Sequence, residues 1–155
     1  AFLLTRSSDL EIDRNCQEGK VSEIQIFNTH LLTYDNKEVI LPHGILSTGT
    51  MTVFSKQDTR RVDWVFSIAY GDDYDKAKAV LKRLCSEDSR ILATPETMIE
   101  LIKLNNSSVD LTVRAWVKTP DYWPVFFAMN EKVYKTFAEE GLSIPFPQMD
   151  VHMKQ

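Results

Sequence analysis

The chain has 155 residues, 43% of them hydrophobic and 26% charged, which is enough to build a core in one ordinary domain or two small ones. Its net charge of −4 argues against a broad surface for nucleic acid or anionic lipid, because such a surface requires a basic excess. No stretch approaches the roughly 20 apolar residues that a membrane-spanning helix needs, so we expect that the chain does not cross a membrane by itself and is soluble.

The two cysteines, Cys16 and Cys85, lack Cys-x-x-Cys spacing. A secreted disulfide scaffold would be richer in cysteine, so the composition favours a reducing, cytosolic setting. The apolar run at residues 1–4 is too short for a signal peptide, and Arg6 follows it closely.

The first third of the chain reads as short strands separated by turn residues. These strands are expected at residues 21–26, 29–34, 38–41 and 51–54. Asp35 and Asn36 tolerate the left-handed backbone of a tight turn and therefore predict a hairpin between the second and third strands. Pro42 and Gly44 then interrupt the pattern. Short strands with turns between them indicate a small, bent β-barrel, which we expect to end near the polar stretch 56–61.

The second part alternates strands and helices. A strand over residues 62–70 precedes a helix with Ala77, Leu81 and Leu84 at helical spacing. Strands follow at residues 98–104 and 109–117, joined by a polar turn at 105–108. A second helix carries Pro124 in its first turn and ends at Gly141. A last strand completes a β-α-β-β-α-β order, which is typical of ferredoxin-like folds and by itself places this strand in the domain's own sheet.

The polar residues show no catalytic or metal-binding constellation. The three histidines, His30, His43 and His152, have no metal-ligand spacing. The acidic cluster at Asp72, Asp73 and Asp75 lacks the Glu that closes a calcium loop, so helix capping explains it better. We therefore expect no enzyme activity, no cofactor and no bound metal.

The last residues form a short alternating strand after two prolines. Met149, Val151 and Met153 share one face, and Gln148, Asp150 and His152 share the other. A strand at a chain end needs a partner, either in its own sheet or in other copies of the chain.

Several segments resemble the small-conductance mechanosensitive channel (MscS) family. Residues 33–44, TYDNKEVILPHG, are similar to its T-x-D-x-x-x-[VI]-x-[IV]-P-N-G segment, with His43 in place of the usual Asn. Residues 19–24 resemble its G-x-V-x-x-I strand, and residues 141–152 resemble its ending, G-I-x-[IF]-P-[FY]-P-Q-x-x-V-x. The resemblance covers nearly the whole chain, from about Asp9 onward.

The resemblance implies an α+β fold in three parts. These are an Sm-like β domain at residues 1–58, a ferredoxin-like α/β domain at 59–145 and a terminal oligomerisation strand at 146–155. In the family the terminal strands of all subunits close a parallel β-barrel on the symmetry axis, and this overrides the placement of that strand in its own sheet. The implied oligomer interface is Gln148, Met149, Asp150, Val151, His152 and Met153, and Pro42 and Gly44 shape a structural turn.

The resemblance also implies a function. The chain would form part of a heptameric vestibule on the cytoplasmic face of the inner membrane, with side portals that pass ions and small solutes during osmotic downshock. The family's pore-lining helix is absent from this chain. The alternative is a stand-alone module that binds RNA or a small ligand, since both domain types host such functions. The net charge of −4 and the lack of an aromatic-basic strand motif argue against RNA.

Overall fold

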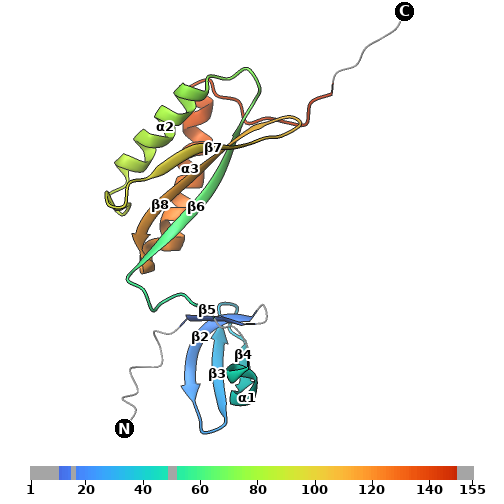
Figure 1. The fold of residues 1–155 in the computed structure, drawn as a ribbon, viewed down its shortest axis with the longest axis vertical. Coiled ribbons are helices and arrows are strands. Elements are labelled where there is room, and N and C mark those ends of the chain that lie inside the picture. Colours follow the sequence, from blue (N-terminus) through green and yellow to red (C-terminus); the bar gives the residue numbers. More distant parts are fainter. Residues whose placement is uncertain (1–10, 15–16, 49–51, 150–155) are drawn as a thin grey trace, which may run out of the picture. The chain divides into compact units, whose positions relative to one another are not determined.

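Figure 1 shows the computed structural model of the chain, which describes residues 11–14, 17–48 and 52–149. The described residues up to Asp58 form one compact unit, and those from Thr59 onward form a second. We call them the β unit and the α/β unit and describe each by itself. Four residues of the expected oligomer interface, Asp150, Val151, His152 and Met153, lie outside the described residues.

The β unit is one antiparallel sheet with strand order β4-β3-β2-β1-β5. Its elements are β1 (Glu11–Arg14), β2 (Gln17–Ile24), β3 (Asn28–Thr33), β4 (Glu38–Pro42), the short helix α1 (His43–Ser47) and β5 (Thr52–Val53). Within the described residues no pairing joins the edge strands β4 and β5. The sheet is therefore open, and the prediction of a closed barrel is wrong. The reason is that β5 has only two residues, and both pair with β1.

The hairpin between β3 and β4 confirms the turn predicted from its sequence. Asn36 adopts a left-handed backbone with φ of 64°, which Asn tolerates better than most side chains. The backbone N–H of Thr33 donates to Lys37 O at 2.9 Å and closes the turn. Leu31 of β3 then faces Val21 and Leu41 in the small core of this unit.

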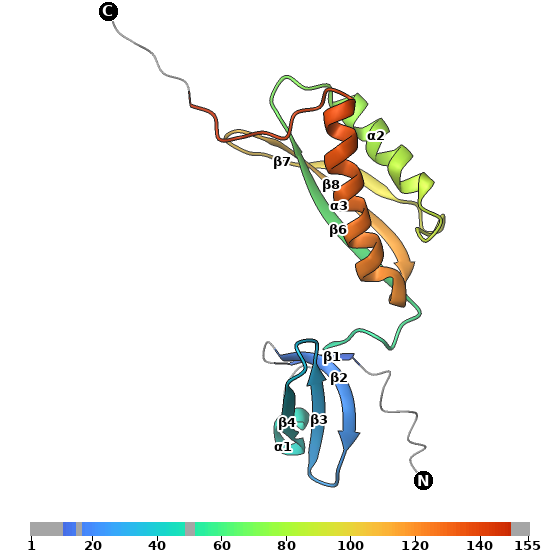
Figure 2. The same cartoon turned by 180° about the vertical axis from the view of Figure 1, so that it is seen from behind.

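The α/β unit is a two-layer structure. Its elements are β6 (Thr59–Ile68), α2 (Tyr74–Glu87), β7 (Met98–Leu104), β8 (Val109–Lys118), the 3-10 turn η2 (Thr119–Asp121) and α3 (Tyr122–Glu139). The antiparallel sheet has the order β6-β8-β7, and both helices lie over the same face of it (Figures 1 and 2). The opposite face carries no helix among the described residues.

Alternation along the strands builds the core between these two layers. Val62 and Trp64 of β6 and Val113 of β8 point to the helical face, where they pack with Leu81 of α2 and Phe137 of α3. All five side chains are at most 2% exposed. Burial of this size supplies most of the stability of such a domain, at about 1.5–3 kcal/mol for each large apolar side chain.

The helix boundaries follow from local chemistry. Asp73 caps α2 by accepting a hydrogen bond from the Lys76 N–H at 3.1 Å. Pro124 lies in the first turn of α3, where its missing N–H leaves no helical bond unmade. Gly141 follows α3 with φ of 71°, the left-handed conformation expected after a helix end.

The structure confirms the β-α-β-β-α order but not the strand expected after it. Among the described residues, 142–149 form no strand, and β6 pairs only with β8. The pattern alone placed a last strand in this sheet. For the described residues up to 149, that prediction is wrong.

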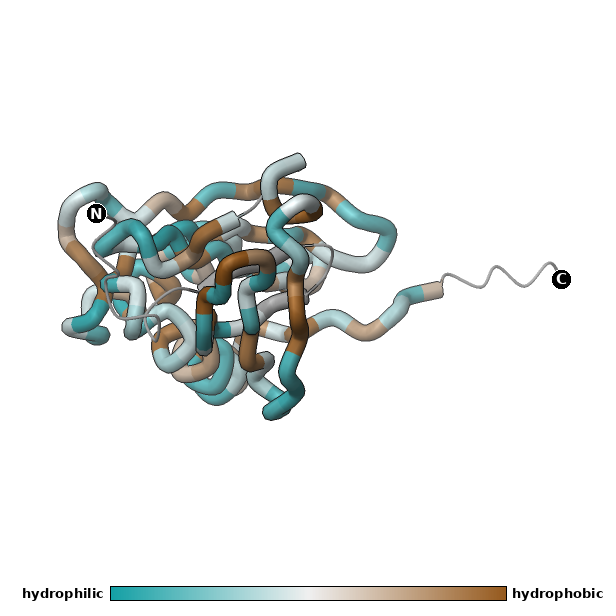
Figure 3. Tube along the Cα trace, turned by 90° about the horizontal axis from the view of Figure 1, so that it is seen from below, coloured by the Kyte–Doolittle hydropathy of each residue, from teal (hydrophilic) through white to brown (hydrophobic). Residues whose placement is uncertain are grey.

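Apolar residues are distributed along the chain in short stretches. Figure 3 shows brown and teal segments in alternation along the coloured part of the trace. Accordingly, no helix in the described part of the chain combines the length and hydropathy of a bilayer span.

Candidate functional site at the terminal segment

The segment after α3 is held against the α/β unit at its first residue. We call residues 143–148 the terminal strap; it is the last coloured stretch before the C-terminus in Figure 1. Ala69 N–H donates to Ser143 O at 3.0 Å, and Ser143 N–H donates to the Asp72 carboxylate at 2.7 Å. Just upstream, Leu142 is 5% exposed and belongs to the core. The strap therefore starts from a fixed point beside the turn that follows β6.

A second anchor lies five residues further on. The Gln148 N–H donates to the hydroxyl oxygen of Ser107 at 3.1 Å, in the turn between β7 and β8. Pro145 and Pro147 lie between the two anchors and have no N–H to donate. The strap thus crosses the end of the sheet without forming a ladder with a strand.

A buried carboxylate stabilises the turn that carries the second anchor. Asp110, only 9% exposed, accepts hydrogen bonds from the hydroxyl of Ser67 at 2.7 Å and that of Ser108 at 2.9 Å. The Asn105 side-chain amide donates to its other oxygen. Tyr70 donates its hydroxyl to Asn105 O at 2.6 Å, which ties this turn to the segment after β6. Both anchors of the strap therefore belong to one connected frame.

The strap covers a hollow and exposes apolar side chains. The hollow measures about 350 Å³ and lies between Ser67, Ser107 and Ser108 on one side and residues 144–147 on the other. Phe146 is 81% exposed and Met149 85%. The Ser67 and Ser108 hydroxyls are engaged with Asp110, and the exposed apolar side chains suit contact with another surface rather than chemistry.

The residues predicted from sequence fall in two places. Gln148 and Met149 lie at the end of the strap, as described above. Pro42 closes β4 and occupies the N-cap position of α1, and Gly44 lies within α1, where an added Cβ would meet nothing within 4 Å. Neighbouring His43 bonds through Nε2 to the Thr29 hydroxyl at 3.0 Å. The structural role of Pro42 and Gly44 stays a prediction.

Sequence reasoning missed Asp72 and Ser107 as anchors. It assigned Asp72 to helix capping together with Asp73, and only Asp73 makes the cap bond. The partners of the two anchors lie 71 and 41 residues away, so no local pattern could have shown them.

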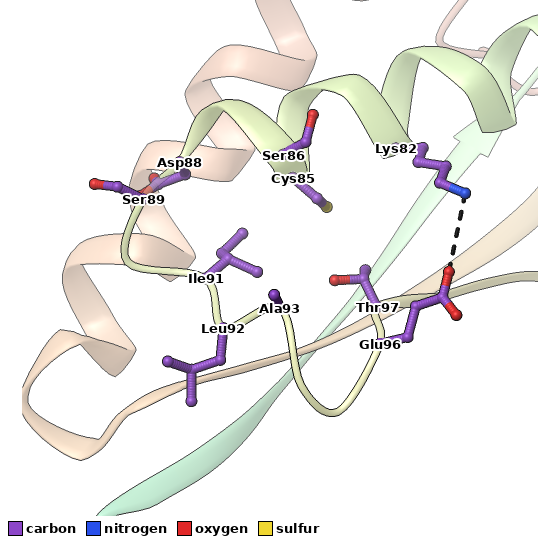
Figure 4. Close-up of a pocket in the computed structure, with 10 residues that line it drawn as sticks. All are labelled: Lys82, Cys85, Ser86, Asp88, Ser89, Ile91, Leu92, Ala93, Glu96 and Thr97. Atoms are coloured by element: carbon purple, nitrogen blue, oxygen red, sulfur yellow. Dashed lines mark ion pairs between the residues drawn. The ribbon is translucent and has the colours of Figure 1, made fainter.

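A second hollow, of about 290 Å³, lies between the end of α2 and the loop 88–97 (Figure 4). Burial raises the pKa of the Cys85 thiol to about 11, so it stays protonated and weakly nucleophilic at neutral pH. Asp88 is 7% exposed and holds Arg90 by two bonds of 2.8 and 2.7 Å, which keep the pKa of its carboxyl below the ordinary value. Both groups are thus accounted for by packing and ion pairing.

No cluster of three or more His, Cys, Asp or Glu side chains arranged for a metal occurs among the described residues. In the hollow of Figure 4, Asp88 is engaged with Arg90, and Lys82 forms an ion pair with Glu96 at 3.9 Å in which both side chains are largely exposed. An exposed pair of this kind is weakly held and offers little to orient a ligand.

Comparisons with known proteins cover both units. A family model described as "Mechanosensitive ion channel, beta-domain" matches residues 11–56, and one described as "Mechanosensitive ion channel MscS, C-terminal" matches residues 62–144. A small-conductance mechanosensitive channel of Edwardsiella ictaluri is 38% identical over 144 residues, covering 93% of this chain and 50% of the relative. An uncharacterized MscS family protein of Synechocystis is 35% identical over 138 residues, covering 89% of this chain and 47% of the relative.

Solved structures show the same fold. The closed-state crystal structure of Helicobacter pylori MscS matches with a TM-score of 0.90 and 24% identity, over 99% of this chain and 61% of that one. MSL1 of Arabidopsis thaliana matches with a TM-score of 0.75 and 16% identity, over 92% of this chain and 51% of that one. The chain spans about half the length of the curated relatives it matches.

Proposed function

Because the chain belongs to the small-conductance mechanosensitive channel (MscS) family, we propose that it forms the vestibule of such a channel on the cytoplasmic face of the inner membrane. In this role copies of the chain assemble into a ring, with seven subunits as the expected number. Ions and small solutes pass through portals between the subunits when the channel opens in osmotic downshock. The observation that carries the proposal is that the two family models match the two units in order.

The surface of the β unit supports a ring. Its core contains Val21, Leu31 and Leu41, whereas Ile26, Phe27 and Ile40 are 84%, 76% and 53% exposed. A small domain that exposes this much apolar surface gains stability by covering it with a neighbour. Contacts between different patches of identical subunits generate a closed ring when the rotation closes.

The terminal strap supports an axial junction. It exposes Phe146 and Met149 and leads directly into the expected interface residues Asp150, Val151, His152 and Met153. Parallel association of the terminal strands around an axis leaves no free strand edge, which removes the hazard of uncontrolled pairing. The vestibule then discriminates among solutes by the size and charge of its portals and needs no catalytic group or cofactor.

The proposal is tested on the full-length product of the gene, purified in detergent. Native mass spectrometry should show a ring of identical subunits, and a host strain without such channels should survive osmotic downshock when it expresses the protein. Deletion of residues 147–155 should weaken the ring while both units stay folded by circular dichroism. A monomeric full-length protein that gives no protection would contradict the proposal.

A further inference from the structure

The two anchors of the terminal strap carry an inference that rests on the proposed function and deepens it. We propose that Asp72 and Ser107 are positioning residues for assembly: they hold the strap across the end of the sheet, and so direct the terminal segment away from its own domain and toward other subunits. The same segment has a competing partner within its own chain, which the anchors disfavour together with Pro145 and Pro147 of the strap.

The competing partner is the outer edge of β6. That strand pairs with β8 on one side only, and no described residue pairs with its other side. A chain returning from α3 reaches this edge first, and in a β-α-β-β-α-β order it would add a fourth strand there. The hydrogen bond from Ala69 N–H to Ser143 O, directly after β6, is one such contact already made.

Asp72 stops this pairing after one residue. Its carboxylate takes the Ser143 N–H at 2.7 Å, so that N–H is not available to extend a ladder. In an extended segment every second N–H points to the same side, and the next two on this side belong to Pro145 and Pro147, which have none. The carboxylate and the two prolines together make the β6 edge a poor partner for the strap.

Ser107 fixes the direction at the far end. Gln148 carries the first N–H after Pro147, and it donates to the Ser107 hydroxyl at 3.1 Å. The turn that holds Ser107 is itself rigid, because Asp110 accepts from Ser108 and the Asn105 amide within it and from Ser67 of β6. Two fixed points five residues apart determine the direction in which residue 149 leaves the domain.

Fixing the direction beforehand favours assembly. A strap that already points outward loses less conformational freedom when the terminal segments meet, and this preorganisation strengthens association without adding an intersubunit contact. Each anchor is one hydrogen bond near the surface, so its loss should weaken association about 2- to 10-fold for each subunit. The effect repeats at every subunit of a ring.

The experiment compares anchor variants with matched controls in the full-length protein. Asp72→Ala and Ser107→Ala each remove one acceptor, whereas Asp75→Ala and Asn106→Ala change exposed neighbours in the same helix start and the same turn. Mass photometry over a dilution series gives the protein concentration at which half of the rings dissociate. We expect this concentration to rise about 2- to 10-fold for each anchor variant and to stay unchanged for the controls.

Two further variants separate positioning from general stability. Asp72→Asn keeps a side-chain oxygen that can accept the Ser143 N–H and should restore most of the assembly. In a background lacking residues 147–155, Asp72→Ala should have no further effect on assembly, because the segment it positions is gone. Any fall in the melting temperature of the α/β unit should be small, as for the loss of one hydrogen bond near the surface, and for Asp72→Ala it should be the same with and without residues 147–155.

The outcomes are distinguishable. If both anchor variants assemble like the controls while the deletion weakens the ring, the positioning role is wrong and the proposed axial junction stands. If the deletion also leaves assembly unchanged, both are overturned. If Asp72→Ala weakens assembly of the truncated protein as much as that of the full-length protein, and also lowers the melting temperature strongly, the residue is structural and the positioning role is again wrong.

Discussion

Among described side chains, the β unit buries a core of Val21, Leu31 and Leu41, whereas the α/β unit buries one continuous cluster drawn from three strands and two helices. The β unit also leaves large apolar side chains in solvent, with Ile26 84% and Phe27 76% exposed. A sheet needs a second layer to cover one of its faces. The α/β unit supplies that layer with its own helices, and in the ring proposed above the β unit would obtain it from neighbouring subunits.

The largest expected effect comes from opening a cavity in the larger core. Phe137 is 1% exposed, so Phe137→Ala should lower the free energy of unfolding of the α/β unit by about 3–5 kcal/mol. Leu31→Ala in the β unit should cost about 2–3 kcal/mol, since fewer neighbours surround that side chain. Urea denaturation followed by hydrogen-exchange mass spectrometry reads the two units separately. Equal loss of protection in both units from either variant would show that they do not unfold independently.

An intermediate effect is expected from a close backbone approach in the β unit. A Cβ on Gly19 would lie 2.7 Å from Leu32 O in the neighbouring strand, so Gly19→Ala should force β2 and β3 apart and cost about 1–3 kcal/mol. The matched control is Gly44→Ala, because Gly44 is helical and has open space around it. That variant should be neutral or stabilise by up to about 1 kcal/mol. Thermal unfolding checks both, and a destabilised Gly44→Ala would support the structural turn proposed for that position.

The last comparison concerns the ion pairs of the two units, of which the exposed pair should give the smallest effect. Asp88 holds Arg90 in a buried site, so Asp88→Asn should lower the free energy of unfolding by about 1–3 kcal/mol at neutral pH. The folded pKa of Asp88 is lowered, so this contribution is present above the ordinary value of 3.8 and is lost as the pH falls through the folded value. Urea denaturation of both proteins from pH 7 to pH 2 should show the difference vanish in acid.

The matched pair in the β unit is Asp35 with Lys37, which is exposed. The hydrogen bond from Lys37 lowers the pKa of the Asp35 carboxyl. Because solvent screens an exposed pair, it contributes little to stability. Asp35→Asn should therefore change stability less than Asp88→Asn and lose its effect in high salt. If Asp35→Asn destabilised the protein more than Asp88→Asn, the expectation that the buried pair contributes more would be wrong.

Much of the α/β unit could be predicted because its signals are local. The strands alternate, the helices repeat their apolar residues at helical spacing, and the ends are marked by Asp73 and Gly141. The hairpin at Asn36 was predictable for the same reason, since the turn conformation depends on that residue itself. The family followed from short motifs that occur in one stretch of chain each.

Sequence by itself therefore determined the order of the elements, their caps and turns, and the family to which the chain belongs. Only the tertiary structure decided the open edge of the β-unit sheet and the path of the terminal strap. Asp72 meets Ser143 across 71 residues, and Ser107 meets Gln148 across 41. The physical reason is that such hydrogen bonds depend on where the whole fold brings two backbones together, which no periodicity or motif within either segment encodes.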